Sequence, residues 1–380
     1  MLLLKSLRLF LVAIWLCCLV SAAFSQQATA TSLSGKLVEV KVPAPALKGN
    51  MLGEPTQLSV SVYLPPSYET APAKRYATLY LLHGFLGNDK AWTINGYQGM
   101  NLKSVMDGMI KDAKARELIV VVPNSWSQYG GAFYTNSTVT GNWEDYIYRD
   151  LVQFVDANYR TIPAAESRGV AGHSMGGYGA LVLGMKHPDV FSVVYALSPC
   201  CTALEGDMSA TNPVWHKVLS LTSKEQLKLR PQSFDDFYTI ALVALAAAFS
   251  PNPDRAPLYV DFPFKVQKTS GEGTITALEN NPVTYDRWRS KMPLYMVEQN
   301  QQNLRKLRGL FIDYGEKEQF SHIVIGGRGL SKSLAQLSIP HVFEVYAGGD
   351  HSSKVRERIE KRVLPFFSEK LVTDGALPQP

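Results

Sequence analysis

Residues 168–179 read RGVAGHSMGGYG and contain the pattern Gly-x-Ser-x-Gly centred on Ser174. An apolar stretch precedes the pattern and a helix-compatible stretch follows it. A strand, a sharp turn and a helix in that order hold a serine hydroxyl in the open at a helix N-terminus. Gly172 and Gly176 suit such a turn, because side chains there would collide with the neighbouring strand and helix. The pattern predicts a nucleophilic serine, but so short a pattern also occurs by chance and needs support from the rest of the chain.

Apolar runs and helical stripes alternate on both sides of this turn. Runs without polar interruption are typical of parallel strands covered on both faces, and apolar residues at helical spacing indicate helices that face a core. The expected strands are 77–82, 118–122, 168–173, 191–197, 309–314 and 341–346, and the expected helices are 101–116, 145–159, 175–186, 320–337 and 355–370. Residues 58–64 alternate apolar and polar and predict a half-exposed antiparallel edge strand. The chain is therefore predicted to be an α/β protein with a mostly parallel, doubly wound sheet over residues 37–372.

The alternation stops between about residues 200 and 305. Prolines are frequent there, and the remaining periodicity is helical or absent. We interpret residues 200–305 as an insertion or lid on the rim of the sheet, made mostly of helix and loop. Within it, the Ala-rich stretch Thr239–Phe249 is too short to span a membrane and predicts a buried or lid helix.

The first 25 residues have the pattern of a secretory signal peptide. Lys5 and Arg8 precede an apolar run from Leu9 to Val20, and small residues follow up to Ser25. An uncleaved membrane anchor is the alternative, although the apolar run is short for a span. We expect cleavage after Ser25, a disordered leader over 26–36, a frayed tail over 373–380, and a secreted or periplasmic protein with no stable membrane insertion.

Composition narrows the class of function further. The 380 residues carry a formal net charge of +5 with no basic cluster interleaved with aromatics, so a nucleic-acid partner is not expected. No group of His and Asp residues has the spacing of metal ligands, and neither a metal nor another cofactor is expected. Once the signal is removed only the neighbours Cys200 and Cys201 remain, and they predict a pair of free thiols because a bond between adjacent cysteines is strained.

A serine nucleophile needs a base, and the base needs an acid to orient it. His351 follows a predicted strand within GGDHS, as a base at the carboxyl end of a parallel sheet should. The other histidines fit less well, since His173 lies inside the turn and His322 within a helix. The acid should follow the strand 309–314 and precede the histidine. Candidates for that acid are Asp313, still inside the strand, and Glu316 and Glu318 on the loop beyond it.

Two backbone amides should stabilise the oxyanion that forms during acyl transfer. The amide of Met175 directly follows the serine, and that of Phe85 lies in the turn after His83-Gly84. Trp92 and Trp143 are candidate substrate-binding residues, with a role as core aromatics the equal alternative.

Several segments together resemble the esterase D-like family of α/β-hydrolases. They are YLLHGFLGNDKAW, VVPN, GHSMGGYGALVLGMKHPDVFSVVYALSP, IDYGEKEQF and GGDHS, and they cover roughly residues 55–200 and 305–370. The family includes S-formylglutathione hydrolases, feruloyl and acetyl esterases, and mycolyl-transferring proteins. The resemblance implies Ser174 as nucleophile, His351 as general base, and the oxyanion hole at Phe85 and Met175. It places the acid at Glu318, where aspartate is more common in the family.

Three hypotheses of function follow. The first is a secreted serine esterase that cleaves a small-molecule or glycan-linked ester through an acyl-enzyme. The second is an acyltransferase that passes the acyl group to a sugar or lipid hydroxyl. The third is a carbohydrate- or lipid-binding protein on the same scaffold with little turnover. The esterase is our first hypothesis, and the third is the least favoured because all members of a Ser-His-Glu triad are present. Exclusion of water from the site, which the sequence does not show, would distinguish the second from the first.

Overall fold

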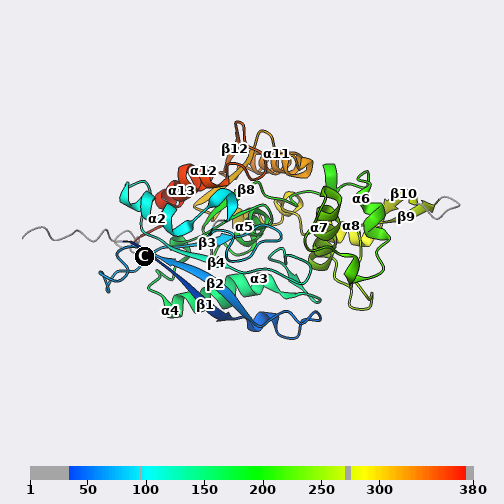
Figure 1. The fold of residues 1–380 in the computed structure, drawn as a ribbon. Helices are drawn as coiled ribbons and strands as arrows, with labels where there is room; N and C mark the ends of the chain where they lie inside the picture. The colour runs from blue at the N-terminus through cyan, green and yellow to red at the C-terminus, as the bar shows by residue number, and fades with distance from the viewer. Residues whose placement is uncertain (1–33, 95, 270–274, 374–380) are drawn as a thin grey trace, which may run out of the picture. The chain divides into compact units, whose positions relative to one another are not determined.

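A sheet of eight strands forms the centre of the computed structural model, which describes residues 34–94, 96–269 and 275–373 (Figure 1). The strands lie in the order β1-β2-β4-β3-β7-β8-β11-β12. Strand β2 runs antiparallel to both of its neighbours, and the other pairs are parallel. The strand bounds are β1 Lys36–Pro43, β2 Gln57–Leu64, β3 Thr78–Leu82, β4 Ile119–Pro123, β7 Arg168–His173, β8 Val193–Leu197, β11 Gly309–Gly315 and β12 Val342–Tyr346. The predicted α/β class with a mostly parallel sheet is confirmed.

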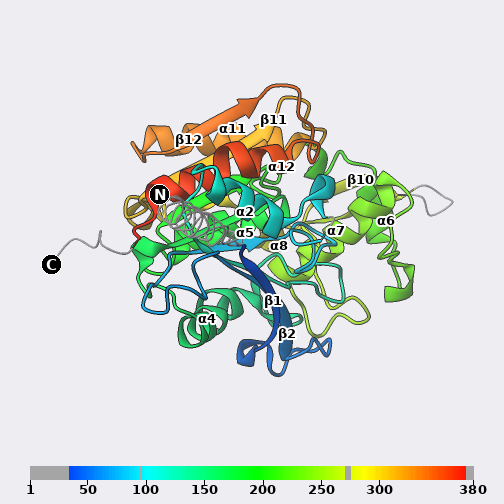
Figure 2. The same cartoon turned by 60° about the vertical axis from the view of Figure 1, so that its left-hand side comes forward.

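Helices cover both faces of this sheet (Figures 1 and 2). Side chains of β3 point alternately into two apolar cores, Tyr80 and Leu82 into one and Leu79 and Leu81 into the other. The first core includes α3 (Trp143–Asp145), α4 (Val152–Asn158), α5 (Met175–Lys186) and α11 (Ser321–Gln336). The second includes α2 (Leu102–Lys111), α12 (Val355–Arg358) and α13 (Leu364–Lys370). Short π-helical turns over 146–151 and 359–363 join α3 to α4 and α12 to α13.

The expected edge strand lies inside the sheet instead. Strand β2 is bordered by β1, which is the actual edge, and most of β2 is buried. Its alternating polar residues do not face water, because the hydroxyls of Ser59 and Ser61 donate hydrogen bonds to the buried carboxylate of Asp89 at 3.2 and 3.0 Å. A half-exposed strand and a buried strand with satisfied hydroxyls give the same sequence alternation. Lys36, expected in a disordered leader, is the first residue of β1.

Residues 200–305 form helices joined by loops, and a large part of this segment lies beside one end of the sheet (Figure 1). They include α6 (Val214–Leu219), α7 (Phe234–Phe249), α8 (Pro282–Arg289), α9 (Pro293–Met296) and α10 (Gln301–Leu304). The Ala-rich stretch lies in α7 and is buried, as predicted. A two-stranded hairpin of β9 (Phe264–Thr269) and β10 (Ile275–Asn280) was not predicted. In β9 only Phe264 is buried, so the sequence carries no apolar alternation that would mark a strand.

The predictions made for the two ends of the chain concern residues that lie largely outside the part that the structure describes. The predicted signal peptide and most of the leader belong to residues 1–33, and the predicted tail to 374–380 apart from Thr373. The hydroxyl of Thr373 accepts a hydrogen bond from Arg116 at 3.0 Å. In the portion of the chain that is described, no helix combines the length and the apolar character that a membrane crossing requires.

Candidate active site

Ser174 stands at the turn between β7 and α5 in a backbone conformation that few side chains adopt. Its φ is +57° and its ψ is −115°, a strained geometry that non-glycine residues keep only when the surroundings impose it. A Cβ atom on Gly172 would lie 2.4 Å from the backbone of Gly176, and one on Gly176 would lie 2.3 Å from the carbonyl oxygen of Leu82. The two glycines therefore let the turn pack against β3. Ser174 is half-buried while its neighbours in sequence are buried, so its side chain reaches the surface of a pocket.

His351 lies on the loop after β12 and lines the same pocket as Ser174. Side chains from neighbouring segments form hydrogen bonds to both its backbone amide and its backbone carbonyl oxygen. Its amide donates to Oε1 of Gln319 at 3.1 Å, and its carbonyl oxygen accepts from Nε2 of His173 at 2.7 Å. Burial lowers the pKa of His173 to about 3, so this ring is neutral and Nε2–H is the donor. The ring of His351 also packs edge-on against Phe320 at 4.7 Å between centroids.

Glu318 is the carboxylate that contacts this histidine. Its Oε2 lies 2.9 Å from Nδ1 of His351, and its side chain has no solvent exposure. Its Oε1 accepts the amide of Phe320 at 3.2 Å, which fixes the carboxylate plane. Glu318 ends a tight turn in which its amide donates to the carbonyl of Gly315. The longer glutamate side chain, a departure from the pattern of the resembling family, thus reaches the histidine.

The two other acidic candidates have different partners. Glu316 accepts a hydrogen bond from the amide of Gly348 at 3.1 Å and is exposed. Asp313 is fully buried inside β11, where Arg358 donates two hydrogen bonds to it at 2.8 and 2.5 Å and Tyr195 donates a third at 2.6 Å. Asp313 therefore ties the last helices to the sheet, in keeping with the fold-supporting role expected of it.

Of the two residues expected at the oxyanion hole, Met175 directly follows Ser174, and Phe85 lines the same pocket as Ser174. Met175 is the first residue of α5, and the first amides of a helix have no partner within the helix. Phe85 lies in the turn after β3, which is closed by hydrogen bonds from the amide of Gly87 to the carbonyl of Gly84 and from Leu86 to Gly130. The side chain of Phe85 lines the pocket beside Ser174. A helix N-terminus and an adjacent loop amide are groups that can stabilise a developing negative charge.

Buried polar side chains support the loop that carries Phe85. His83 is fully buried, and burial lowers its pKa to about 4, so it is neutral. Its Nδ1–H donates to the carbonyl of Gly84 at 2.8 Å while Nε2 accepts the amide of Ser125 at 2.9 Å. The amide of Gly84 donates to the hydroxyl of Tyr97 at 2.7 Å, and Tyr134 donates to the carbonyl of His83 at 2.8 Å. Together these hydrogen bonds restrain the turn that carries Phe85.

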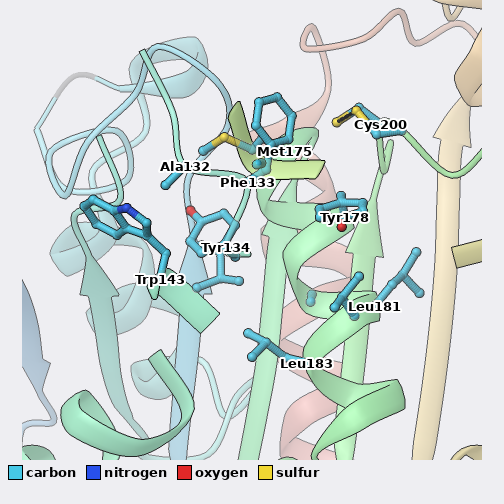
Figure 3. Close-up of a cluster of buried hydrophobic side chains, with 14 of the residues drawn as sticks. Ala132, Phe133, Tyr134, Trp143, Met175, Tyr178, Leu181, Leu183 and Cys200 are labelled. Atoms are coloured by element: carbon cyan, nitrogen blue, oxygen red, sulfur yellow. Dashed lines mark hydrogen bonds between the residues drawn. The ribbon is translucent and has the colours of Figure 1, made fainter. Parts of the chain in front are cut away.

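The pocket itself is apolar and is built largely by residues that the sequence did not point to. Helix α7 contributes one face of the pocket. The residues of that face are Phe237, Tyr238, Ala241, Leu242 and Leu245, which recur at helical spacing. Cys200 and Cys201 lie at the base of the pocket as free thiols, with sulfur atoms 2.7 Å apart, and Figure 3 shows Cys200 near Met175 and Phe133. The lining residues besides Ser174 and His351 are Phe85, Phe133, Cys200, Cys201, Met208, Phe237, Tyr238, Ala241, Leu242, Leu245, Phe320, His322 and Ile323.

Trp92 and Trp143 do not line this pocket, which corrects the interpretation of them as substrate-binding residues. Both have no solvent exposure. The indole of Trp92 donates to the carbonyl of Leu82, and that of Trp143 to the carbonyl of Thr140. Figure 3 shows Trp143 beside Tyr134, within the apolar core. Both are core aromatics whose N–H groups are satisfied internally, the alternative considered from the start.

Comparisons with known proteins identify the family and the fold. A family model described as "Putative esterase" matches residues 52–358. Among solved structures, a ferulic acid esterase is 21% identical with a TM-score of 0.59, covering 89% of this chain and 99% of its own. An S-formylglutathione hydrolase from Agrobacterium tumefaciens is 16% identical with a TM-score of 0.56, covering 90% and 97%. The substrate-bound fluorophosphonate-binding serine hydrolase F of Staphylococcus aureus is 17% identical with a TM-score of 0.54, covering 88% and 99%.

The family model spans most of the chain, and the solved structures share its α/β-hydrolase fold. The chain belongs to this esterase family and is a carboxylic ester hydrolase.

Proposed function

We propose that the protein is a secreted or periplasmic serine esterase that cleaves carboxylic esters through an acyl-enzyme, with Ser174, His351 and Glu318 as its triad. One observation carries the proposal. The strained Ser174 lines the same pocket as His351, and Nδ1 of His351 is hydrogen-bonded to the fully shielded Glu318 at 2.9 Å. A serine hydroxyl gains nucleophilicity only beside such an oriented base.

The proposed reaction has two halves. In the first, Oγ of Ser174 attacks the ester carbonyl while Nε2 of His351 takes its proton, and Glu318 stabilises the resulting imidazolium. The amides of Met175 and Phe85 donate to the oxyanion. The alcohol leaves with the proton from His351. In the second half, His351 takes a proton from water, the hydroxide attacks the acyl group, and collapse of the intermediate returns the proton to Ser174 and releases the acid.

The substrate of this reaction has an apolar acyl group. The side chains around Ser174 are aromatic and aliphatic, and α7 closes the pocket on the side of residues 200–305. Burying apolar acyl surface there contributes about 25 cal/mol per Å² to binding. The name of one structural neighbour, a ferulic acid esterase, refers to an aromatic acid and is consistent with a pocket of this kind.

Hydrolysis of a p-nitrophenyl ester series, from acetyl to long acyl chains, tests the proposal. The protein starting at Gln26 is compared with Ser174→Ala and with Ser220→Ala, a control at an exposed serine after α6. We expect Ser174→Ala to lose at least about 10³-fold in kcat, as triad serines do, and Ser220→Ala to match the wild type. A fluorophosphonate should label only proteins that retain Ser174. Unchanged hydrolysis by Ser174→Ala would overturn the proposal.

Export is tested separately, because the predicted signal peptide lies outside the described residues. The full-length chain is expressed in a secreting host and the mass of the exported protein is measured. Cleavage after Ser25 predicts a chain that begins at Gln26. Retention of residues 1–25 on a membrane-bound product would contradict a secreted or periplasmic enzyme while leaving the proposed chemistry intact.

A further inference from the structure

One buried polar atom in the pocket has no partner, and it belongs to neither Ser174 nor His351. His322, the second residue of α11, is 5% exposed and lines the pocket. Its Nε2 is buried without a hydrogen bond, and among the residues that line the pocket it is the only side chain with such an atom in the described part of the chain. Buried polar groups are nearly always paired, so an orphaned one needs an explanation.

Asp207 fixes the orientation of this ring. Its Oδ1 lies 2.6 Å from Nδ1 of His322 and accepts the amide of His322 at 3.0 Å. Its Oδ2 accepts the amide of Ser321 at 3.0 Å and the hydroxyl of Tyr238. In return, the amide of Asp207 donates to the hydroxyl of Ser321 at 2.9 Å. The ring is held by its Nδ1 edge, so the edge that carries Nε2 faces away from Asp207.

These bonds also settle how Nδ1 is paired. Burial by itself raises the pKa of Asp207, but the hydrogen bond and the charge interaction with His322, together with the hydrogen bonds from Tyr238 and the backbone, outweigh it and bring the pKa to about 2. The carboxylate is therefore ionised and accepts from Nδ1–H. Nε2 is then the ring atom left for a partner, and a hydroxyl, which can both donate and accept, can pair with it. The pocket has a cavity of about 40 Å³, more than one water molecule requires.

We infer that His322 is a substrate-binding residue whose Nε2 forms a hydrogen bond with a hydroxyl on the acyl group of the ester. The inference rests on the proposed function and adds to it the acyl group's polar feature. Five aromatic side chains line the same pocket and suit a flat acyl group: Phe85, Phe133, Phe237, Tyr238 and Phe320. An acyl group without the hydroxyl leaves Nε2 unpaired when the pocket closes on it, which disfavours that substrate.

The test compares two p-nitrophenyl esters that differ by one hydroxyl, those of 3-(4-hydroxyphenyl)propanoic and 3-phenylpropanoic acid. We expect the wild type to favour the hydroxylated ester by about tenfold in kcat/KM, because one more hydrogen bond to a buried polar atom changes binding by about that factor. In His322→Leu the ratio should fall to about one. In His322→Gln, whose amide reaches a similar position, part of the preference should remain. A control, His216→Leu, changes a half-buried histidine of α6 that does not line the pocket and should keep the wild-type ratio.

Equal kcat/KM for the two esters in the wild type, or an unchanged ratio in His322→Leu, would overturn the inference. Calorimetric Kd values of the two free acids provide a readout that needs neither turnover nor a folded Leu variant. Tighter binding of the hydroxylated acid by the wild type, reduced in His322→Gln and lost in His322→Leu, supports the inference, and equal Kd values in the wild type overturn it. This readout separates the two claims, because acid binding does not depend on whether Ser174 is the nucleophile.

Discussion

The carboxylate of Glu318 and the imidazole of His351 are joined by a hydrogen bond of 2.9 Å, formed where no part of the Glu318 side chain meets solvent. The two residues come from loops that follow different strands, β11 and β12, which are parallel neighbours in the sheet. The pairing of those strands is what brings the loops together. A shielded hydrogen bond of this kind holds a histidine in one tautomer and one orientation.

Glu318→Gln should lower kcat by about 10²- to 10⁴-fold, because the amide neither enforces the required tautomer nor stabilises the imidazolium. The matched control is Glu316→Gln, two residues earlier in the chain. The carboxylate of Glu316 is exposed and accepts a hydrogen bond from the amide of Gly348. Rates on a p-nitrophenyl ester are measured for both variants. A large loss in Glu316→Gln with a small one in Glu318→Gln would reverse the assignment of the acid.

Asp313→Asn should destabilise the fold and leave the rate of ester hydrolysis nearly unchanged. The substitution leaves Arg358 with a weaker buried partner, and breaking a buried ion pair costs about 3–5 kcal/mol of unfolding free energy. Glu344, which also contacts Arg358 at 2.9 Å, reduces that loss. Urea unfolding measures the destabilisation, and kcat/KM in the absence of denaturant should stay within about threefold of the wild type. Loss of kcat in a variant that remains folded would show that Asp313 acts in catalysis.

Two glycine-to-alanine substitutions should have opposite effects on stability. At Gly172 a new Cβ would lie 2.4 Å from the backbone of Gly176, so the turn that carries Ser174 must shift. We expect a loss of about 3 kcal/mol or more, typical of an overpacked core, together with lower activity. At Gly108 in α2 a Cβ meets nothing within 4 Å, and alanine should stabilise the helix by about 0.5–1 kcal/mol. Thermal unfolding of both variants decides, and equal effects would contradict the packing argument.

Glu54 should make stability depend on pH. Burial raises its pKa to about 7 from the ordinary value of 4.5, while the amide of Gln128, a donor at 2.8 Å, and the charge of Lys224 oppose the rise. Between pH 4.5 and 7 the folded state therefore binds more protons than the unfolded state, and stability falls as pH rises. Glu54→Gln removes this dependence, so the variant should gain stability relative to the wild type between pH 4.5 and 7.

Glu117 provides a control of opposite sign. Burial raises its pKa, but hydrogen bonds from Lys74 and Ser67 outweigh this effect and lower the pKa below its ordinary value. Its carboxylate contributes stability above pH 4.5 that is lost as pH falls. Urea unfolding at pH 5 and pH 8 should therefore show Glu54→Gln relatively more stable at pH 8, and Glu117→Gln destabilised at both. A pH-independent difference between wild type and Glu54→Gln would refute the shift.

The sequence predicted features that depend on local pattern and missed those that depend on distant contacts. The strand-turn-helix around Ser174 follows from residues within a dozen positions, and the parallel strands from their uninterrupted apolar runs. The polar alternation of β2 was misread because its hydroxyls find a buried partner, Asp89, thirty positions away. The hairpin of β9 and β10 was missed because most side chains of β9 face solvent, so burial leaves no clear pattern in that strand.

The candidate site likewise combines residues that the local sequence predicted with residues that only distant contacts reveal. His351 could be proposed from its place after a strand, and Glu318 from a family resemblance, since the residues alone left Glu316 and Asp313 open. Trp92 and Trp143 were misplaced, because size and aromaticity do not distinguish a core position from a pocket wall. His322 was passed over because a histidine inside a helix is usually structural. Only its contact with Asp207, more than one hundred positions away, reveals the unpaired nitrogen.

Helix α7 makes one wall of the pocket with side chains from a segment separate from the loops that hold the triad candidates. Exchanging residues along this one helical face is therefore a route to a library of enzymes with altered acyl preference, in which a single nine-residue window, 237–245, is varied and the reactive groups keep their sequence. Part of the choice of ester can thus be engineered at positions that lie apart from the groups proposed to react with it.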